Sequence, residues 1–313
     1  MVLLKLRIHL KDHKITLVRR IVQIITFILI NYVIIETIFA INLKGFEDLI
    51  KVLPILNTPR NPLSQGAGIL EYIFFSIANG FFPLLLIAVF ILFILFTNRS
   101  FCGWVCPIGT IQDACAAIPT KKKTPKTKTH KSLLNVKYVI IIILIIFIIP
   151  LGLTRNTNQL FYLEFKTQLG EFGRKPIGYF SMSEFIFTYF IEFITDWSTI
   201  FNSGDWGAIF IFLFYLLILI LSIWYPRIYC RYFCPYAAIS AVVADYSFLK
   251  LSRNPVRCVG RSECGICEKV CPKQIRILEE PFEFFTGNGE CNICLTCKEK
   301  CPYNAIIIKF GNV

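Results

Sequence analysis

Four apolar stretches separated by polar segments dominate the first 225 residues of the chain. They cover residues 21–41, 72–97, 133–153 and 207–225. Each is long enough to cross roughly 30 Å of hydrocarbon as an α-helix. Pro83 predicts a kink in the second stretch. The segment 177–201 is rich in aromatic residues but also carries three acids, so we interpret it as interfacial and not as a further span.

The overall composition agrees with a protein that is largely in lipid. Of the 313 residues, 55% are hydrophobic and 30 are Phe, more apolar surface than a globule of this size can bury. The first stretch is too long for the apolar part of a signal peptide and lacks a small-residue cleavage site. We therefore expect it to be retained as a span.

Lys and Arg residues are distributed unevenly between the polar segments. The first 20 residues contain six and segment 98–132 contains seven, whereas segments 42–71 and 154–206 contain three and four. Positive residues favour the cytoplasmic side of a membrane. We therefore predict a multi-pass protein of the cell (inner, cytoplasmic) membrane with both termini in the cytoplasm.

Eight of the thirteen cysteines fall within the last sixty residues, in two copies of one pattern that ends in Cys-Pro. The second copy has the spacing C-x2-C-x2-C-x3-C-P, which is the spacing of bacterial ferredoxins with two clusters. Zinc sites use two cysteine pairs separated by a longer gap. Disulfide frameworks belong to secreted chains, whereas this segment is expected in the cytoplasm. The pattern therefore favours iron–sulfur ligands.

Residues 255–309 resemble the two-[4Fe-4S] ferredoxin fold, an α+β fold in which each repeat lends its fourth cysteine to the other cluster. By this resemblance, the first cluster is held by Cys258, Cys264, Cys267 and Cys301. The second cluster is held by Cys291, Cys294, Cys297 and Cys271. The first repeat departs from the family pattern, because five residues separate Cys258 from Cys264 where the pattern has two.

A second motif, C-x3-C-P, follows two of the apolar stretches and supplies Cys102, Cys106, Cys230 and Cys234. If each helix continues, the two cysteines of a pair lie on one face about 6 Å apart. Two such pairs would then offer four thiolates to a third iron–sulfur cluster, beside arginines such as Arg99. A redox-active disulfide and two buried, inert pairs are the alternatives. Cys115 has no partner by spacing and is predicted to be structural.

Four spans, two C-x3-C-P motifs and a two-cluster unit together resemble the membrane polyferredoxin family, which includes NapH-type quinol dehydrogenase subunits. The resemblance implies an α-helical membrane protein with about four transmembrane helices and a C-terminal ferredoxin-like domain. Its sections would be a basic cytoplasmic tail (1–20), a membrane domain (21–250) and the ferredoxin-like domain (251–313). It also implies electron transfer at the cytoplasmic face between quinol, or a low-potential donor, and a partner redox subunit or soluble carrier. The alternative is a maturation or regulatory protein that supplies electrons for metal-centre assembly, or for metal or disulfide reduction.

Signatures of other cofactors and partners are absent from the sequence. The three histidines, His9, His13 and His130, lie outside the apolar stretches, so a haem between spans lacks axial histidines. No C-x-x-C-H motif and no glycine-rich dinucleotide loop occurs. The lysines of residues 121–131 lack interleaved aromatics, which favours contact with anionic lipid over nucleic acid. Glu36 lies inside the first stretch and is a candidate proton acceptor at a quinone site, or a residue that reaches water at the outer end.

Overall fold

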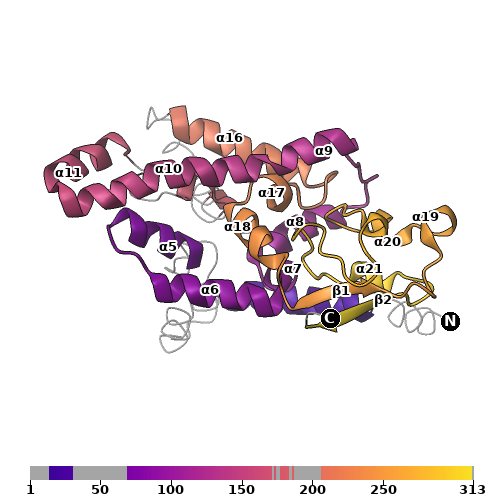
Figure 1. Cartoon of the computed structure of the whole chain (residues 1–313). Helices are drawn as coiled ribbons and strands as arrows, with labels where there is room; N and C mark the ends of the chain where they lie inside the picture. Colours follow the sequence, from indigo (N-terminus) through magenta and orange to yellow (C-terminus); the bar gives the residue numbers. More distant parts are fainter. Residues whose placement is uncertain are drawn as a thin grey trace. The chain divides into compact units, whose positions relative to one another are not determined.

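The computed structural model describes residues 14–30, 69–170, 173, 177–182, 185–186 and 206–311. These residues are mostly helical, with one small sheet (Figure 1). They form two compact units. The first contains the described parts of Met1–Phe27, Ile91–Asp113 and Ile239–Val313, and the second those of Ile28–Phe90 and Ala114–Ala238. The C-terminal cysteines therefore share a unit with an N-terminal helix and with the segment that carries Cys102 and Cys106.

One described helix is long and apolar enough to cross a membrane. Helix α10 (Val136–Thr157) continues from α9 (Thr127–Leu134), and the most apolar part of the stretch Lys128–Thr157 has a mean hydropathy of 2.9. Only 33% of its most apolar part is buried inside the protein. An outward-facing apolar surface of this length fits a helix in contact with lipid. It corresponds to the third predicted span.

The second predicted span is interrupted and not merely kinked. Helix α5 (Ile69–Ala78) ends before a turn in which Gly80 has a φ of 74°, and α6 (Leu84–Thr97) begins after Pro83. Gly80 adopts a left-handed conformation that ends the first helix, and Pro83 has no backbone N–H with which to continue it. Apolar composition alone predicted one helix because it does not register this break.

The other two predicted spans are described only in part. Helix α2 (Lys14–Ile30) contains the start of the first one, whereas residues 31–41, with Glu36, lie outside the described residues. Helix α16 (Trp206–Leu221) covers most of the fourth. The acids of the predicted interfacial segment also lie outside the described residues. Four spans therefore stay a prediction.

In the second unit, α10 packs against α5 and α11 (Gln159–Gln168). Gly152 permits this approach, because an added Cβ would lie 2.1 Å from the carbonyl oxygen of Ile77. The unit also contains the 3₁₀ turn η2 (Gly178–Phe180) and α17 (Ile228–Tyr232).

The first unit is built around a two-stranded antiparallel sheet of β1 (Leu249–Arg253) and β2 (Ile306–Phe310), which lie side by side in Figure 1. Buried Leu251, Phe285 and Ile306 pack in one core with cysteines of both repeats. Cys267 lies in the short helix α20 (Ile266–Lys269) and Cys297 in α21 (Thr296–Glu299). The same part of the chain also contains α19 (Gly260–Glu263) and η4 (Ile277–Glu279). Three further helices are α7 (Ser100–Trp104), α8 (Pro107–Ala117) and α18 (Pro235–Ala244), the last two extending into the second unit.

Candidate iron–sulfur sites

Four cysteines from both repeats line one hollow in the first unit. They are Cys258, Cys264, Cys267 and Cys301. The hollow opens to solvent. This is the set that the ferredoxin resemblance implied for the first cluster. It includes Cys258 despite the longer loop, and Cys301 despite its position in the second repeat.

The two repeats share a backbone conformation that explains how distant cysteines meet. Gly265 and Leu295, which each follow the second cysteine of a repeat, have φ values of 64° and 59°. Gln274 and Asn304, which each lie three residues after the lending cysteine, have φ values of 55° and 48°. Each donates its N–H to the carbonyl of that cysteine, at 3.0 and 3.2 Å. These matching turns bend both loops in the same way.

The five residues between Cys258 and Cys264, three more than the family pattern has, are accommodated at the surface. They contain the short helix α19, where Arg261 forms ion pairs with Glu268 at 2.9 Å and Glu279 at 3.2 Å. Gly260, with a φ of 81°, provides the left-handed turn that begins this helix. The insertion therefore leaves Cys258 on the wall of the hollow.

The thiols of the other predicted set lie close enough to influence one another. Burial, aided by Cys294 and Cys271 and opposed by Arg99, raises the pKa of Cys291 to about 12. Burial likewise raises the pKa of Cys297, and Cys294, Cys291 and Cys271 raise it further. Cys271 therefore lies beside the thiols of the second repeat. Without iron these thiols keep their protons at neutral pH, so binding iron releases them.

The cysteines surround space and do not converge on a point. Among the residues that the structure describes, no three His, Cys, Asp or Glu side chains come together closely enough to hold one metal ion. A single zinc ion needs four ligands at about 2.0–2.3 Å. A four-iron cluster instead takes one thiolate at each of four separated irons, so the donors around the hollow fit that group.

Hydrogen bonds to sulfur are already present around both sets. The backbone N–H of Ala305 donates to Sγ of Cys301 at 3.3 Å, and Oγ1 of Thr296 donates to Sγ of Cys294 at 3.5 Å. Nη1 of Arg253 reaches Sγ of Cys258 at 3.9 Å. Such donors stabilise the more negative, reduced state of an iron–sulfur centre.

Both C-x3-C-P motifs end a short helix in the same way. The N–H groups of Val105 and Cys106 both donate to the carbonyl of Phe101, at 2.9 and 3.0 Å. In the second motif, the N–H groups of Phe233 and Cys234 donate to the carbonyl of Tyr229, also at 2.9 and 3.0 Å. Neither helix therefore continues through its pair, so the condition for the two cysteines to share one helical face is not met. The helix ends before the second cysteine, because the proline that follows disfavours helical backbone there.

The first C-x3-C-P motif packs on the loop of the second repeat. Nε1 of Trp104 donates to the carbonyl of Ile293 at 2.9 Å. An added Cβ on Gly103 would lie 2.3 Å from the carbonyl oxygen of Asn292. Arg99 is 1% exposed, donates to the carbonyl of Gly289 at 2.9 Å and forms an ion pair with Glu290 at 3.1 Å. The arginine predicted to serve this motif thus also holds the loop of the second repeat.

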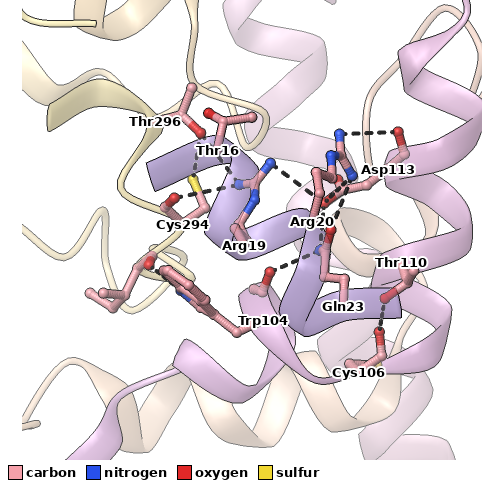
Figure 2. A network of polar contacts seen from close by, with 12 residues as sticks. Thr16, Arg19, Arg20, Gln23, Trp104, Cys106, Thr110, Asp113, Cys294 and Thr296 are labelled. Carbon is pink, nitrogen blue, oxygen red and sulfur yellow. Dashed lines mark hydrogen bonds and ion pairs between the residues drawn. The ribbon is translucent and has the colours of Figure 1, made fainter. Parts of the chain in front are cut away.

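Helix α2 also holds this loop, as Figure 2 shows. Nη1 of Arg19 donates to the carbonyl of Cys294 at 3.5 Å and to Oγ1 of Thr296 at 3.3 Å. Nη2 of the same side chain lies 3.8 Å from Asp113, which also pairs with Arg20 at 3.4 Å. Gln23 donates to Asp113 at 2.9 Å. Sequence reasoning missed this network, although a glutamine inside a predicted apolar stretch was a signal for it.

The four C-x3-C-P cysteines fall in different units. Cys102 and Cys106 belong to the first unit, and Cys230 and Cys234 to the second. A shared third cluster therefore stays a prediction, as does the disulfide alternative. Cys115 lies in α8, where burial raises the pKa of its thiol. Its structural role also stays a prediction.

Comparisons with known proteins agree with iron–sulfur chemistry. A family model described as a 4Fe-4S binding domain matches residues 79–125 and 207–254, and each match contains one C-x3-C-P motif. An uncharacterized protein of Methanocaldococcus jannaschii is 28% identical over 227 residues, or 71% of this chain and 68% of that protein. The putative electron transport protein YccM of Escherichia coli is 26% identical over 238 residues, or 73% of this chain and 57% of YccM.

A more distant relative is the ferredoxin-type protein NapH of Haemophilus influenzae. It is 22% identical over 213 residues, or 65% of this chain and 60% of NapH. No solved structure matches the chain. The resemblance to the polyferredoxin family is therefore confirmed. The chain is similar to a putative electron transport protein and to a ferredoxin-type protein, and two of its segments match a 4Fe-4S binding domain.

Proposed function

We propose that this protein is a membrane-anchored electron carrier with two [4Fe-4S] clusters in its C-terminal part. One would be held by Cys258, Cys264, Cys267 and Cys301, and the other by Cys291, Cys294, Cys297 and Cys271. The observation that carries the proposal is the hollow lined by four cysteines from both repeats. Each cluster supplies reversible one-electron chemistry when bound. The exchanged cysteines would keep the two clusters close together.

The remaining parts of the chain would anchor and connect this unit. Helix α10 is the candidate anchor, and we propose further spans at the other apolar stretches, with both termini in the cytoplasm. The contact of α7 with the loop of the second repeat would place the first C-x3-C-P motif beside the second cluster. Electrons would pass between quinol, or a low-potential donor, and a partner redox protein at the cytoplasmic face.

Iron and acid-labile sulfide, measured per chain after anaerobic purification, test the proposal. Two clusters predict about eight of each, and a third cluster at the C-x3-C-P cysteines predicts about twelve, since each cluster holds four irons. The matched control is the chain with Cys264→Ser and Cys294→Ser, which removes one ligand from each proposed cluster. A colourless, iron-free wild-type chain contradicts the proposal.

Reduction by quinol then tests the donor. If a quinol analogue reduces the clusters of the purified chain, and Glu36→Gln slows this reduction, the quinone-linked role is supported. If only a low-potential reductant such as dithionite reduces them, quinol is excluded as the direct donor. Electrons would then come from another protein, as the role in metal-centre assembly requires.

A further inference from the structure

Arg253 occupies a fixed position on the wall of the cysteine-lined hollow. It ends strand β1 opposite Ile306, which lines the same hollow. Its backbone N–H donates to the carbonyl of Phe282 at 2.9 Å, and its guanidinium lies 4.3 Å from the centre of the Phe282 ring. Nη2 donates to the carbonyl of Glu280. Because strand, ring and carbonyl all hold it, the guanidinium has little freedom to leave the hollow.

The charge of this side chain is buried without an ion pair. Arg253 is only 4% exposed, and no carboxylate among the described residues lies within 4.0 Å of it. Its Nε is buried and has no hydrogen-bond partner among those residues. Taking a charged group out of water is costly unless opposite charge and hydrogen bonds compensate it. Burial raises the pKa of the Glu280 carboxyl, and Arg253 opposes this increase only as the smallest influence on it. A negative group in the hollow would therefore compensate the guanidinium more directly.

The ligands of the hollow provide such a group when iron is bound. Four thiolates on a four-iron cluster carry net negative charge, and one-electron reduction adds one more negative charge. Nη1 already reaches Sγ of Cys258 at 3.9 Å. Cys258 is also the ligand that is separated from the rest of its repeat by the five-residue loop. A cation at this position would compensate the negative charge of the cluster and would hold Cys258 at the wall of the hollow.

We infer that Arg253 is a positioning residue that pairs electrostatically with the cluster held by Cys258, Cys264, Cys267 and Cys301, and raises its reduction potential. This inference rests on the proposed function, because it requires a cluster in that hollow. A positive charge close to the cluster stabilises the reduced, more negative state more than the oxidised one. We expect the effect to be largest at this cluster, because Nη1 of Arg253 contacts Sγ of Cys258, one of its proposed ligands.

Arg261 offers a matched control in the same part of the chain. Its side chain is 52% exposed, and it forms ion pairs with Glu268 at 2.9 Å and Glu279 at 3.2 Å. Two carboxylates and water screen its charge from the hollow. Replacing Arg261 by Gln changes the net charge of the protein by the same amount as replacing Arg253. Only the second change removes a buried charge from the cluster wall.

The test is an EPR-monitored redox titration of the full-length holoprotein with Arg253→Gln, Arg253→Lys and Arg261→Gln. For Arg253→Gln we expect the equilibrium constant for reducing one cluster to fall at least tenfold, or about 59 mV for one electron. Arg253→Lys should recover most of this loss, whereas Arg261→Gln should change the constant less than twofold. A merely structural arginine would leave the potential of an intact cluster unchanged, and that result overturns the inference.

Two outcomes separate this inference from the proposed function. A wild-type chain without clusters refutes the proposed function before Arg253 is tested. If Arg253→Gln fails to retain the cluster, the wild-type holoprotein labelled with ¹⁵N-arginine decides. Pulsed EPR of the reduced cluster should then detect a coupled arginine nitrogen that Arg253→Lys removes. If no arginine nitrogen couples to either cluster, the inference is wrong.

Discussion

The contact between helix α7 and the loop of the second repeat can be tested with Gly103→Ala. An added Cβ would lie 2.3 Å from the carbonyl oxygen of Asn292 and 3.5 Å from its carbonyl carbon, whereas ordinary contacts begin at 3.4 Å. One of the two segments must therefore move by about 1.1 Å. Neither can move freely, because Trp104 donates to the carbonyl of Ile293 at 2.9 Å.

Overpacking of this kind costs about 1–3 kcal/mol. That range corresponds to roughly a 5- to 150-fold loss in the folding equilibrium constant. Loss of the indole hydrogen bond would add about 1 kcal/mol. The measurement is the denaturation midpoint of the anaerobically purified holoprotein, followed by the visible absorbance of its clusters. We expect the variant to lose its cluster absorbance at lower denaturant concentration than wild type.

The Asn292→Ala variant provides the control. The side-chain Cγ of Asn292 would lie 3.7 Å from the new Cβ, so the clash is with the backbone and not with the side chain. Removing that side chain should therefore not rescue Gly103→Ala in the double variant. The reasoning is refuted if Gly103→Ala unfolds at the wild-type midpoint, or if Asn292→Ala restores it.

Two further predictions concern buried charge. Asp113→Asn should destabilise the holoprotein by about 3–5 kcal/mol, seen as a lower denaturation midpoint, because Arg19 would keep a buried charge without its partner. Arg20→Gln should destabilise the protein less than Asp113→Asn, because the side chain of Arg20 is 35% exposed. Equal losses of stability in the two variants would contradict the importance of the buried pair. For the cluster-free chain, the folded state raises the pKa of Cys291 from 9.0 to about 12 and that of Cys267 to about 11. The folded chain therefore binds these thiol protons more tightly than the unfolded chain, so its free energy of unfolding should fall as the pH rises above about 9. A free energy of unfolding that is independent of pH from about 8 to 11 would contradict the raised thiol pKa values.

The ferredoxin resemblance named four cysteines that line one hollow in the structure, and their role as cluster ligands stays a prediction. Both repeats have a left-handed backbone conformation after their second cysteine, at Gly265 and Leu295, so the two cysteine loops bend in the same way. The longer loop after Cys258 does not remove this cysteine from the hollow, because the loop extends at the surface and its two ends stay in place.

The contacts between distant segments were not predictable in the same way. Arg19 and Arg20 look like charges that orient a membrane protein, yet both pair with Asp113 more than ninety residues away. Arginines that orient a membrane protein and arginines that form buried ion pairs are the same residue type, so composition cannot distinguish the two roles. Similarly, an apolar stretch does not reveal where Gly80 and Pro83 interrupt its helix.

The exchange of cysteines between the repeats is the central claim, and EPR of single-serine variants tests it most directly. Each variant is purified anaerobically, reduced and compared with wild type, with iron content as the measure of retained cluster. The account predicts that Cys301→Ser and Cys264→Ser perturb the same cluster signal, and that Cys297→Ser perturbs the other one. If Cys301→Ser instead alters the signal that Cys297→Ser alters, each repeat holds its own cluster and the account is contradicted.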